Sequence, residues 1–315
     1  MENSDLINQI VKKEFNLPAE LLSQDAITNA YYNYDKISSI AKWIEERIHF
    51  KPRIGIICGS GLSDIAYLIA DKQEIQYADI PEFPRSTVHG HKGVFAYGNL
   101  NNLPVICMQG RFHPYEGYST ALCTLPLKVL KLLGVKLVII TNAAGGLNPS
   151  LSVGDLMLIK DHFSLPLLSM QNPLVGHNDE RFGPRFVPVS NIYDKKLRAL
   201  MHKCGKELNL DLKEGVYGTI SGPSYETVTD SLFYLKNGAD CVGMSTSHEA
   251  TVACYCGLKV VALSIITDKV AIEYDAEDGS DHNEIVKIAK LKAKDAEKLV
   301  SYFITQLGMD SRWLE

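Results

Sequence analysis

Residues 136–146 have the sequence KLVIITNAAGG, an apolar and partly β-branched run that ends in asparagine and small residues. Five more runs of this kind occur: IGIICG at 54–59, PVICMQG at 104–110, DLMLIKDHF at 155–163, GVYGTISG at 215–222 and KVVALSIITD at 259–268. Such runs are typical of β-strands. Because their hydrophobicity is continuous rather than alternating, we expect both faces of the sheet to be buried.

Amphipathic stretches alternate with these strands and predict helices. They lie near 36–48, 120–133, 194–208, 227–237, 247–256 and 283–307, and three of them end at Gly134, Gly238 and Gly257. This order predicts an α/β fold in which helices cover a twisted central sheet. No repeat or linker divides the chain, so we expect one catalytic domain over 35–315, preceded by an extension over 1–34, with a mobile loop from Glu273 to Asp281.

The composition is that of an ordinary soluble globular protein, with 46% hydrophobic and 22% charged residues. The net charge is −5, and the 32 basic and 37 acidic side chains are interspersed. This charge distribution creates no positive electrostatic potential that would attract a polyanion, so we expect no nucleic-acid partner.

Targeting signals are absent from the sequence as given. The amino terminus has no apolar core of signal-peptide length, and the run at Leu137–Ala144 is too short for a membrane span. We therefore expect a cytoplasmic protein with no membrane partner. The seven cysteines lie mainly in apolar stretches, which favours reduced core thiols and no metal site.

Polar residues follow the predicted strands, where ligands collect in an open α/β sheet. After the first strand comes GSGLS at 59–63, a turn into a predicted helix whose amides and Ser60 hydroxyl could hold phosphate. The alternative is a tight turn with Ser60 as a helix N-cap. A dinucleotide-binding fingerprint is disfavoured because Asp64 occupies the position of its third glycine.

A second polar group, GRFHPYEG at 110–117, follows the strand at 104–110. In extended backbone Arg111, His113 and Tyr115 point to the same side. Arginine can fork onto two phosphate oxygens, and a nearby histidine can add a further charge-assisted bond. The alternative is that Arg111 pairs with Glu116 at the surface.

The chain resembles the trimeric class of purine nucleoside phosphorylases through eight motifs that occur in the same order. They are GSGLS, FPRSTVHGH, QGRFHPYEGY, TNAAGGLNP, GDLMLIKDH, QNPLVGHNDERFGPRF, SGPSYET and VGMS. The resemblance covers roughly residues 36–305. It implies a mixed sheet with a distorted barrel-like core flanked by helices, and a homotrimer. It also implies a pentosyltransferase of purine salvage that cleaves purine (2′-deoxy)ribonucleosides, uses inorganic phosphate as co-substrate and needs no cofactor.

The resemblance also implies site residues. The phosphate site would comprise Ser60, Arg111, His113, the Ala143 amide and Ser245, with His91 near its entrance. Ribose would contact Tyr115, Met244 and His282, and Leu168 from a neighbouring subunit. The base would contact Asn142, Ala143, Ala144, Gly145, Tyr225, Glu226, Val242, Thr267 and Asp268. His113, Glu226, Asp268 and Asn142 would be catalytic. As structural alternatives, Tyr225 would be a core aromatic, Met244 core filler and His282 a helix cap.

Two departures from the family pattern affect specificity. Asp268 stands where the 6-oxopurine enzymes usually have asparagine, and an ionised carboxylate accepts hydrogen bonds but cannot donate them. We therefore expect better activity on 6-amino nucleosides and poorer activity on inosine than is usual for the family. Leu168 replaces a common phenylalanine, which predicts weaker ribose packing and a raised KM. His89 for proline and Ser247-His248 are further changes for which the sequence offers no account.

Three other functions are alternatives to purine nucleoside phosphorolysis. Methylthioadenosine phosphorylase shares the fold and uses aspartate for the adenine amino group, although His282 suits a 5′-hydroxyl better than a thioether. A non-catalytic nucleoside-binding or base-binding protein would not need the complete phosphate set. A nicotinamide dehydrogenase would need the glycine that is missing at Asp64.

Overall fold

The strand predicted at residues 136–146 lies at the centre of the fold. The computed structural model describes residues 9–10, 12–13, 22–88, 91–274 and 282–314. Strand β5 (Leu137–Gly146) pairs in parallel with β1 (Ile54–Cys58) along one edge and with β9 (Lys259–Lys269) along the other. With neighbours on both edges and helices over both faces, nearly all of β5 is buried.

The nine strands form one mixed sheet that closes on itself at one end. Strand β5 also pairs with β8 (Cys241–Gly243), which is followed by β7 (Leu212–Thr219), β6 (Leu156–Ser164) and β9. Because β9 returns to β5, these five strands form a closed ring. The open wing continues from β1 through β4 (Leu103–Gln109) and β3 (Val94–Leu100) to β2 (Ala70–Gln76). The predicted mixed sheet with a barrel-like core is confirmed.

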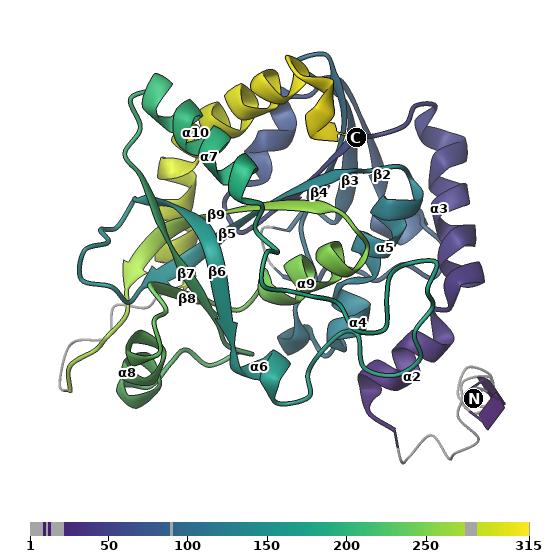
Figure 1. The fold of residues 1–315 in the computed structure, drawn as a ribbon, viewed down its shortest axis with the longest axis horizontal. Helices are drawn as coiled ribbons and strands as arrows, with labels where there is room; N and C mark the ends of the chain where they lie inside the picture. Colours follow the sequence, from purple (N-terminus) through teal and green to yellow (C-terminus); the bar gives the residue numbers. More distant parts are fainter. Residues whose placement is uncertain (1–8, 11, 14–21, 89–90, 275–281, 315) are drawn as a thin grey trace.

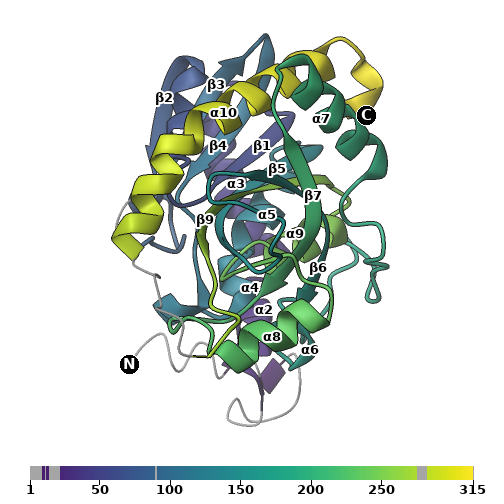
Figure 2. The ribbon, with the colours of Figure 1, turned by 90° about the vertical axis from the view of Figure 1, so that its left-hand side faces the viewer.

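The two largest hydrophobic clusters of the described residues lie on opposite faces of the sheet. One includes side chains of α3 (Tyr34–Ile48), α5 (Leu125–Leu132) and α9 (Ser247–Tyr255). The other includes those of α7 (Lys195–Glu207) and α10 (His282–Gly308). Figures 1 and 2 show α7 and α10 together over one side, with α3 beyond the sheet. The described chain also contains α2 (Gln24–Tyr31), α4 (Thr120–Cys123), α6 (Leu165–Leu168) and α8 (Val228–Lys236).

The predicted strands and helices all occur, with some differences. The strand expected at 215–222 begins at Leu212, and the helix expected at 120–133 divides at Thr124. The sequence did not predict α2, α6, β2, β3 or β8. Strand β2 is an edge strand with only Ile75 buried, so it has no continuous apolar run. The three predicted helix-ending glycines have φ of 99°, 91° and 72°, as a left-handed helix end requires.

Several predictions concern solubility and chain organisation. All seven cysteines are free thiols, as expected. In the described ranges no helix is long and apolar enough to cross a bilayer. The loop predicted from Glu273 to Asp281 falls mostly on residues 275–281, outside the described part, and His89 also lies outside it. The division at residue 34 stays a prediction.

Candidate functional site

One pocket lies where β1, β4, β5, β8 and β9 end. Apolar side chains and a few polar and charged groups line it together, as they do in small-molecule sites. Most predicted site residues line it: Ser60, Arg111, His113, Tyr115, Asn142, Ala143, Ala144, Gly145, Tyr225, Glu226, Val242, Met244, Ser245, Thr267 and Asp268. Gly243, Val270 and Ile285, which the sequence did not single out, line it as well.

The turn after β1 brings Ser60 to the pocket by packing closely on β5. The Gly59 amide donates to Thr141 Oγ1 at 3.2 Å, and a Cβ at position 59 would lie 2.6 Å from the Thr141 carbonyl oxygen. Only glycine permits this approach. The following segment, Ser63–Leu68, is a 3₁₀ helix with Leu62 at its N-cap. The alternative in which Ser60 caps this helix is therefore wrong, and the helix that was predicted to follow the turn is a short 3₁₀ segment.

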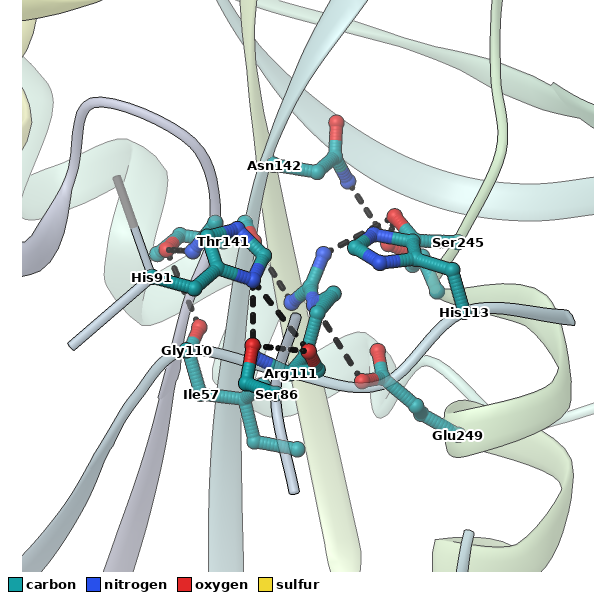
Figure 3. Close-up of polar contacts among 12 residues, drawn as sticks. Ile57, Ser86, His91, Gly110, Arg111, His113, Thr141, Asn142, Ser245 and Glu249 are labelled. Atoms are coloured by element: carbon teal, nitrogen blue, oxygen red, sulfur yellow. Dashed lines mark hydrogen bonds and ion pairs between the residues drawn. The ribbon is translucent and has the colours of Figure 1, made fainter. Parts of the chain in front are cut away.

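Arg111 is 1% exposed and is held on three sides, as Figure 3 shows. One terminal nitrogen donates to Ser245 Oγ at 2.8 Å and the other to the Thr141 carbonyl oxygen at 2.7 Å. Nε lies 3.2 Å from Glu249 Oε1 in an ion pair buried on both sides. The alternative of a surface pair between Arg111 and Glu116 is wrong. Glu249, at the start of α9, is a residue that sequence reasoning missed.

The Glu116 carboxylate holds His113 in place. Glu116 Oε1 accepts from the His113 amide at 2.8 Å and lies 3.1 Å from His113 Nδ1. Burial alone would raise the pKa of Glu116, but hydrogen bonds from His113 and Thr87 outweigh it and lower the pKa to about 2. Burial lowers the pKa of His113. A neutral His113 that donates Nδ1–H to Glu116 keeps Nε2 as an acceptor, which suits the hydroxyl of a monoprotonated phosphate.

Burial is also the largest cause of a lowered pKa for three more histidines, the buried His248 and the half-buried His91 and His162. The pKa falls to about 4 for His91 and His162 and to about 3 for His248. The His91 ring stacks on His113 at a centroid distance of 5.4 Å but does not line the pocket. Within the described part of the chain, Nε2 of His91 and of His248 has no hydrogen-bond partner.

These histidines predict that stability falls in mild acid. Below pH 6.5 the unfolded chain binds protons that the folded protein accepts only near pH 3 to 4. Each histidine that is protonated in the unfolded chain but not in the folded protein should then lower the free energy of unfolding by about 1.4 kcal/mol for each unit that the pH falls. Glu249, whose pKa burial raises against the opposing effect of Arg111, offsets part of this loss. Urea unfolding at pH 7.0, 5.5 and 4.5 measures the slope, and His248→Gln should flatten it. If the variant and the wild type lose stability with the same slope between pH 7.0 and 4.5, His248 does not contribute to the acid sensitivity.

Ser245 is placed by a strained turn between β8 and α9. Thr246 has φ 70° and ψ −56°, and the Ser247 amide donates to the Ser245 carbonyl oxygen at 2.8 Å, which together define a γ-turn. A β-branched residue rarely adopts this conformation, and such strain concentrates at functional sites. Asn142 Nδ2 donates to Thr246 Oγ1 at 2.9 Å and ties the turn to β5.

A β-bulge turns Asp268 toward the pocket. The pairing of β5 with β9 shifts register between Ala144 and Gly145, so that Gly145 lies opposite Asp268. A Cβ at Gly145 would lie 3.1 Å from Asp268 Oδ2 and 2.5 Å from Val270 Cγ2, so the space for Asp268 depends on this glycine. Thr267 Oγ1 donates to Asp268 Oδ1 at 2.8 Å. Carboxylate, hydroxyl and backbone groups thus converge at this end of β9.

The structure places some of the remaining predicted residues in the pocket and others outside it. Tyr225 is 38% exposed and lines the pocket beside Glu226, which contradicts its alternative as a core aromatic. Met244 lines the pocket near Tyr115, which contradicts its alternative as core filler. Leu168 is 73% exposed on α6 and does not line the pocket of its own chain. His282 begins α10, but its side chain lies outside the described part.

No metal site accompanies the pocket in the part of the chain that the structure describes, where no three His, Cys, Asp or Glu side chains are grouped to bind an ion. The pocket instead combines the buried Arg111 guanidinium, the Ser60 and Ser245 hydroxyls and the His113 imidazole with the carboxyl groups of Asp268 and Glu226. The individual roles of these residues stay predictions.

Comparison with known proteins gives consistent results. Residues 53–305 match the family model described as the phosphorylase superfamily. Purine nucleoside phosphorylase of Mus musculus is 42% identical over 89% of this chain and 98% of its own length. Purine nucleoside phosphorylase 1 of Bacillus subtilis is 42% identical over 86% of this chain and 98% of its own length.

A solved structure gives the same result in three dimensions. Schistosoma mansoni purine nucleoside phosphorylase in complex with adenosine matches with a TM-score of 0.84 and 40% identity, over 87% of this chain and 98% of that one. The family-model match includes every residue that lines the pocket. With a shared fold, and with relatives matched almost end to end, the chain belongs to the phosphorylase superfamily, among the purine nucleoside phosphorylases.

Proposed function

We propose that this protein catalyses phosphorolysis of purine (2′-deoxy)ribonucleosides, giving the free base and (2-deoxy)ribose 1-phosphate in purine salvage. The observation that carries the proposal is that a single pocket joins an anion-binding group, Arg111 with Ser245, to a base-recognition group, Glu226 with Asp268. Relatives of the same family have been solved with inosine and, in Schistosoma mansoni isoform 2, with cytosine and ribose 1-phosphate.

The phosphate is the nucleophile in this reaction. Arg111, Ser245, Ser60, the Ala143 amide and His113 would hold it beneath the sugar, where its charge stabilises the positive charge that develops on the ribose ring. A phosphate oxygen forms a bond to C1′ as the bond from C1′ to N9 breaks. Holding the two reactants in this geometry replaces a bimolecular encounter with a nearly unimolecular step.

The leaving base takes the electron pair of the broken bond and needs a proton. Glu226, as a carboxylate, would accept from N1–H of a 6-oxopurine. Asp268 would accept from the exocyclic amino group of adenine when ionised, or donate toward N7 when protonated. Asn142, whose Oδ1 has no hydrogen-bond partner among the described residues, lies in the same pocket. No side chain forms a covalent bond to substrate.

The proposal includes assembly and location. The resemblance to the trimeric class supports a homotrimer, in which the exposed Leu168 of one copy would reach the ribose site of another. It also supports a cytoplasmic enzyme that needs no cofactor besides its phosphate co-substrate. Sedimentation measurements test the trimer.

Substrate comparison tests the proposal against its main rival. Initial rates with saturating phosphate should be at least tenfold higher for the best of inosine, guanosine and adenosine than for methylthioadenosine. A preference for methylthioadenosine would identify the rival activity. Binding of all four without turnover would identify a non-catalytic binding protein.

A further inference from the structure

Helix α2 (Gln24–Tyr31) lies outside the family match, which begins at residue 53, yet it is bonded into the catalytic domain. Ser23 caps it by accepting from the Ala26 amide at 3.2 Å. Figure 1 shows α2 beside α4, on the side of the molecule away from α7 and α10. Several of the contacts that hold it are buried hydrogen bonds.

Asp25 of α2 holds the first turn of α4. Its Oδ1 accepts from the Ala121 amide at 2.7 Å, and its Oδ2 accepts from Thr120 Oγ1 at 2.9 Å. Thr28 Oγ1 lies 2.8 Å from the hydroxyl of Ser119, the α4 N-cap. Asp25 is buried, and burial raises the pKa of its carboxyl although these hydrogen bonds oppose the shift. A carboxylate from a separate helix therefore fixes the backbone at 119–121.

Asn29 adds bonds to two further segments, and together with the bonds of Asp25 and Thr28 these form the α2 clamp. Its Nδ2 donates to the carbonyl oxygens of Pro173 and Val175 at 2.8 and 2.9 Å, and its Oδ1 accepts from the buried Lys128 at 2.8 Å. A Cβ at Gly176 would lie 2.7 Å from Ala26 Cα, so α2 approaches this loop as closely as backbones allow. Helix α2 thus connects α4, α5 and the loop at 173–176.

The segment fixed by α2 continues directly from the proposed phosphate and ribose residues. Arg111 and His113 have anchors of their own in Glu249 and Glu116. The Tyr115 ring stacks on His113, at 4.6 Å between ring centroids and 15° between planes, and lies close to Gly222, within a short 3₁₀ turn over Pro114–Glu116. Glu116 holds the backbone next to Tyr115 by its bonds to the His113 amide and to Thr87, and α2 fixes the segment at 119–121 that follows.

We propose that α2 is a positioning element for Tyr115, acting through the bonds of Asp25 to Thr120 and Ala121. This inference rests on the proposed function, because Tyr115 would pack against the nucleoside sugar. Loss of the clamp should affect nucleoside binding more than phosphate binding, since Arg111 and His113 are held independently.

Steady-state kinetics of Asp25→Ala, measured where the variant is fully folded, tests this inference. We expect the KM for nucleoside to rise five- to tenfold, while kcat and the KM for phosphate stay within twofold. Asp25→Asn should restore most of the loss, because an amide oxygen can still accept from Ala121 and Thr120 can donate to the Gln171 carbonyl oxygen, 3.2 Å away. Asp35→Ala, an exposed carboxylate on α3, is the matched control.

Hydrogen exchange supplies a readout that does not depend on activity. Amides of residues 113–122 should exchange faster in Asp25→Ala, while those of 137–146 should not change. Unchanged kinetics and exchange in an active enzyme would overturn the inference, as would an equal effect on both KM values. If Asp25→Ala does not fold, Thr28→Val replaces it, with the same expected directions. An inactive wild type would refute the proposed function instead, and the exchange result would still decide the role of α2.

Discussion

Replacing Arg111 with methionine is expected to lower kcat/KM for phosphorolysis by about two to three orders of magnitude, the usual cost of losing one donor to developing charge or bound anion. It should also destabilise the fold by about 3 to 5 kcal/mol, because Glu249 would remain as a buried carboxylate without its ion-pair partner. Both effects follow from the position of Arg111 between the pocket and α9.

Combining Arg111→Met with Glu249→Gln separates the two effects. The double variant should recover most of the stability, since no unpaired charge remains, but none of the activity. Urea unfolding and initial rates at varied phosphate measure the cycle, and Arg181→Met, an exposed arginine, is the control. A double variant that regains activity would show that Arg111 acts only through the fold.

Asp268→Asn is expected to raise the ratio of kcat/KM for inosine to that for adenosine by ten- to a hundredfold. Asparagine donates toward O6 or N7 of a 6-oxopurine, whereas an aspartate carboxylate accepts from the 6-amino group. A tenfold change corresponds to about 1.4 kcal/mol of differential transition-state stabilisation. Gly145 leaves room beside the side chain, so the isosteric change should not disturb the bulge.

Two comparisons control this experiment. Asp268→Ala removes the acceptor without adding a donor, so it should weaken adenosine cleavage without improving inosine cleavage. Glu226 favours N1–H of 6-oxopurines in wild type and variant alike, so its contribution cancels when the ratio is compared between the two proteins. An unchanged ratio in Asp268→Asn would show that Asp268 does not set base preference.

Much of the fold could be predicted because its strands carry a strong local signal. The run at 136–146 is apolar over most of its length, and in the structure it has strand neighbours on both edges and helices over both faces. The edge strand β2 and the three-residue β8 carry no such signal, since their existence depends on the partner strand. The closure of β9 onto β5 followed only from the family resemblance.

Site residues could be predicted where a single sequence motif carries them, but contacts between distant segments could not. Arg111 and His113 follow a buried strand, so their approach to a common pocket was expected from the sequence. The carboxylate of Glu249 was not, because nothing local to α9 shows that it faces Arg111. The γ-turn at Thr246 could not be foreseen either, since threonine normally avoids positive φ. Val270 was within reach, because it follows Asp268 by two residues near the end of β9.

Phosphate dependence of base release tests the central claim most directly. Purified protein is incubated with inosine, guanosine or adenosine, with and without inorganic phosphate, and base and sugar products are quantified. The proposed function predicts base release only with phosphate, with ribose 1-phosphate formed in equal amount. Base release without phosphate, with free ribose as product, would contradict it, as would no release from any purine nucleoside.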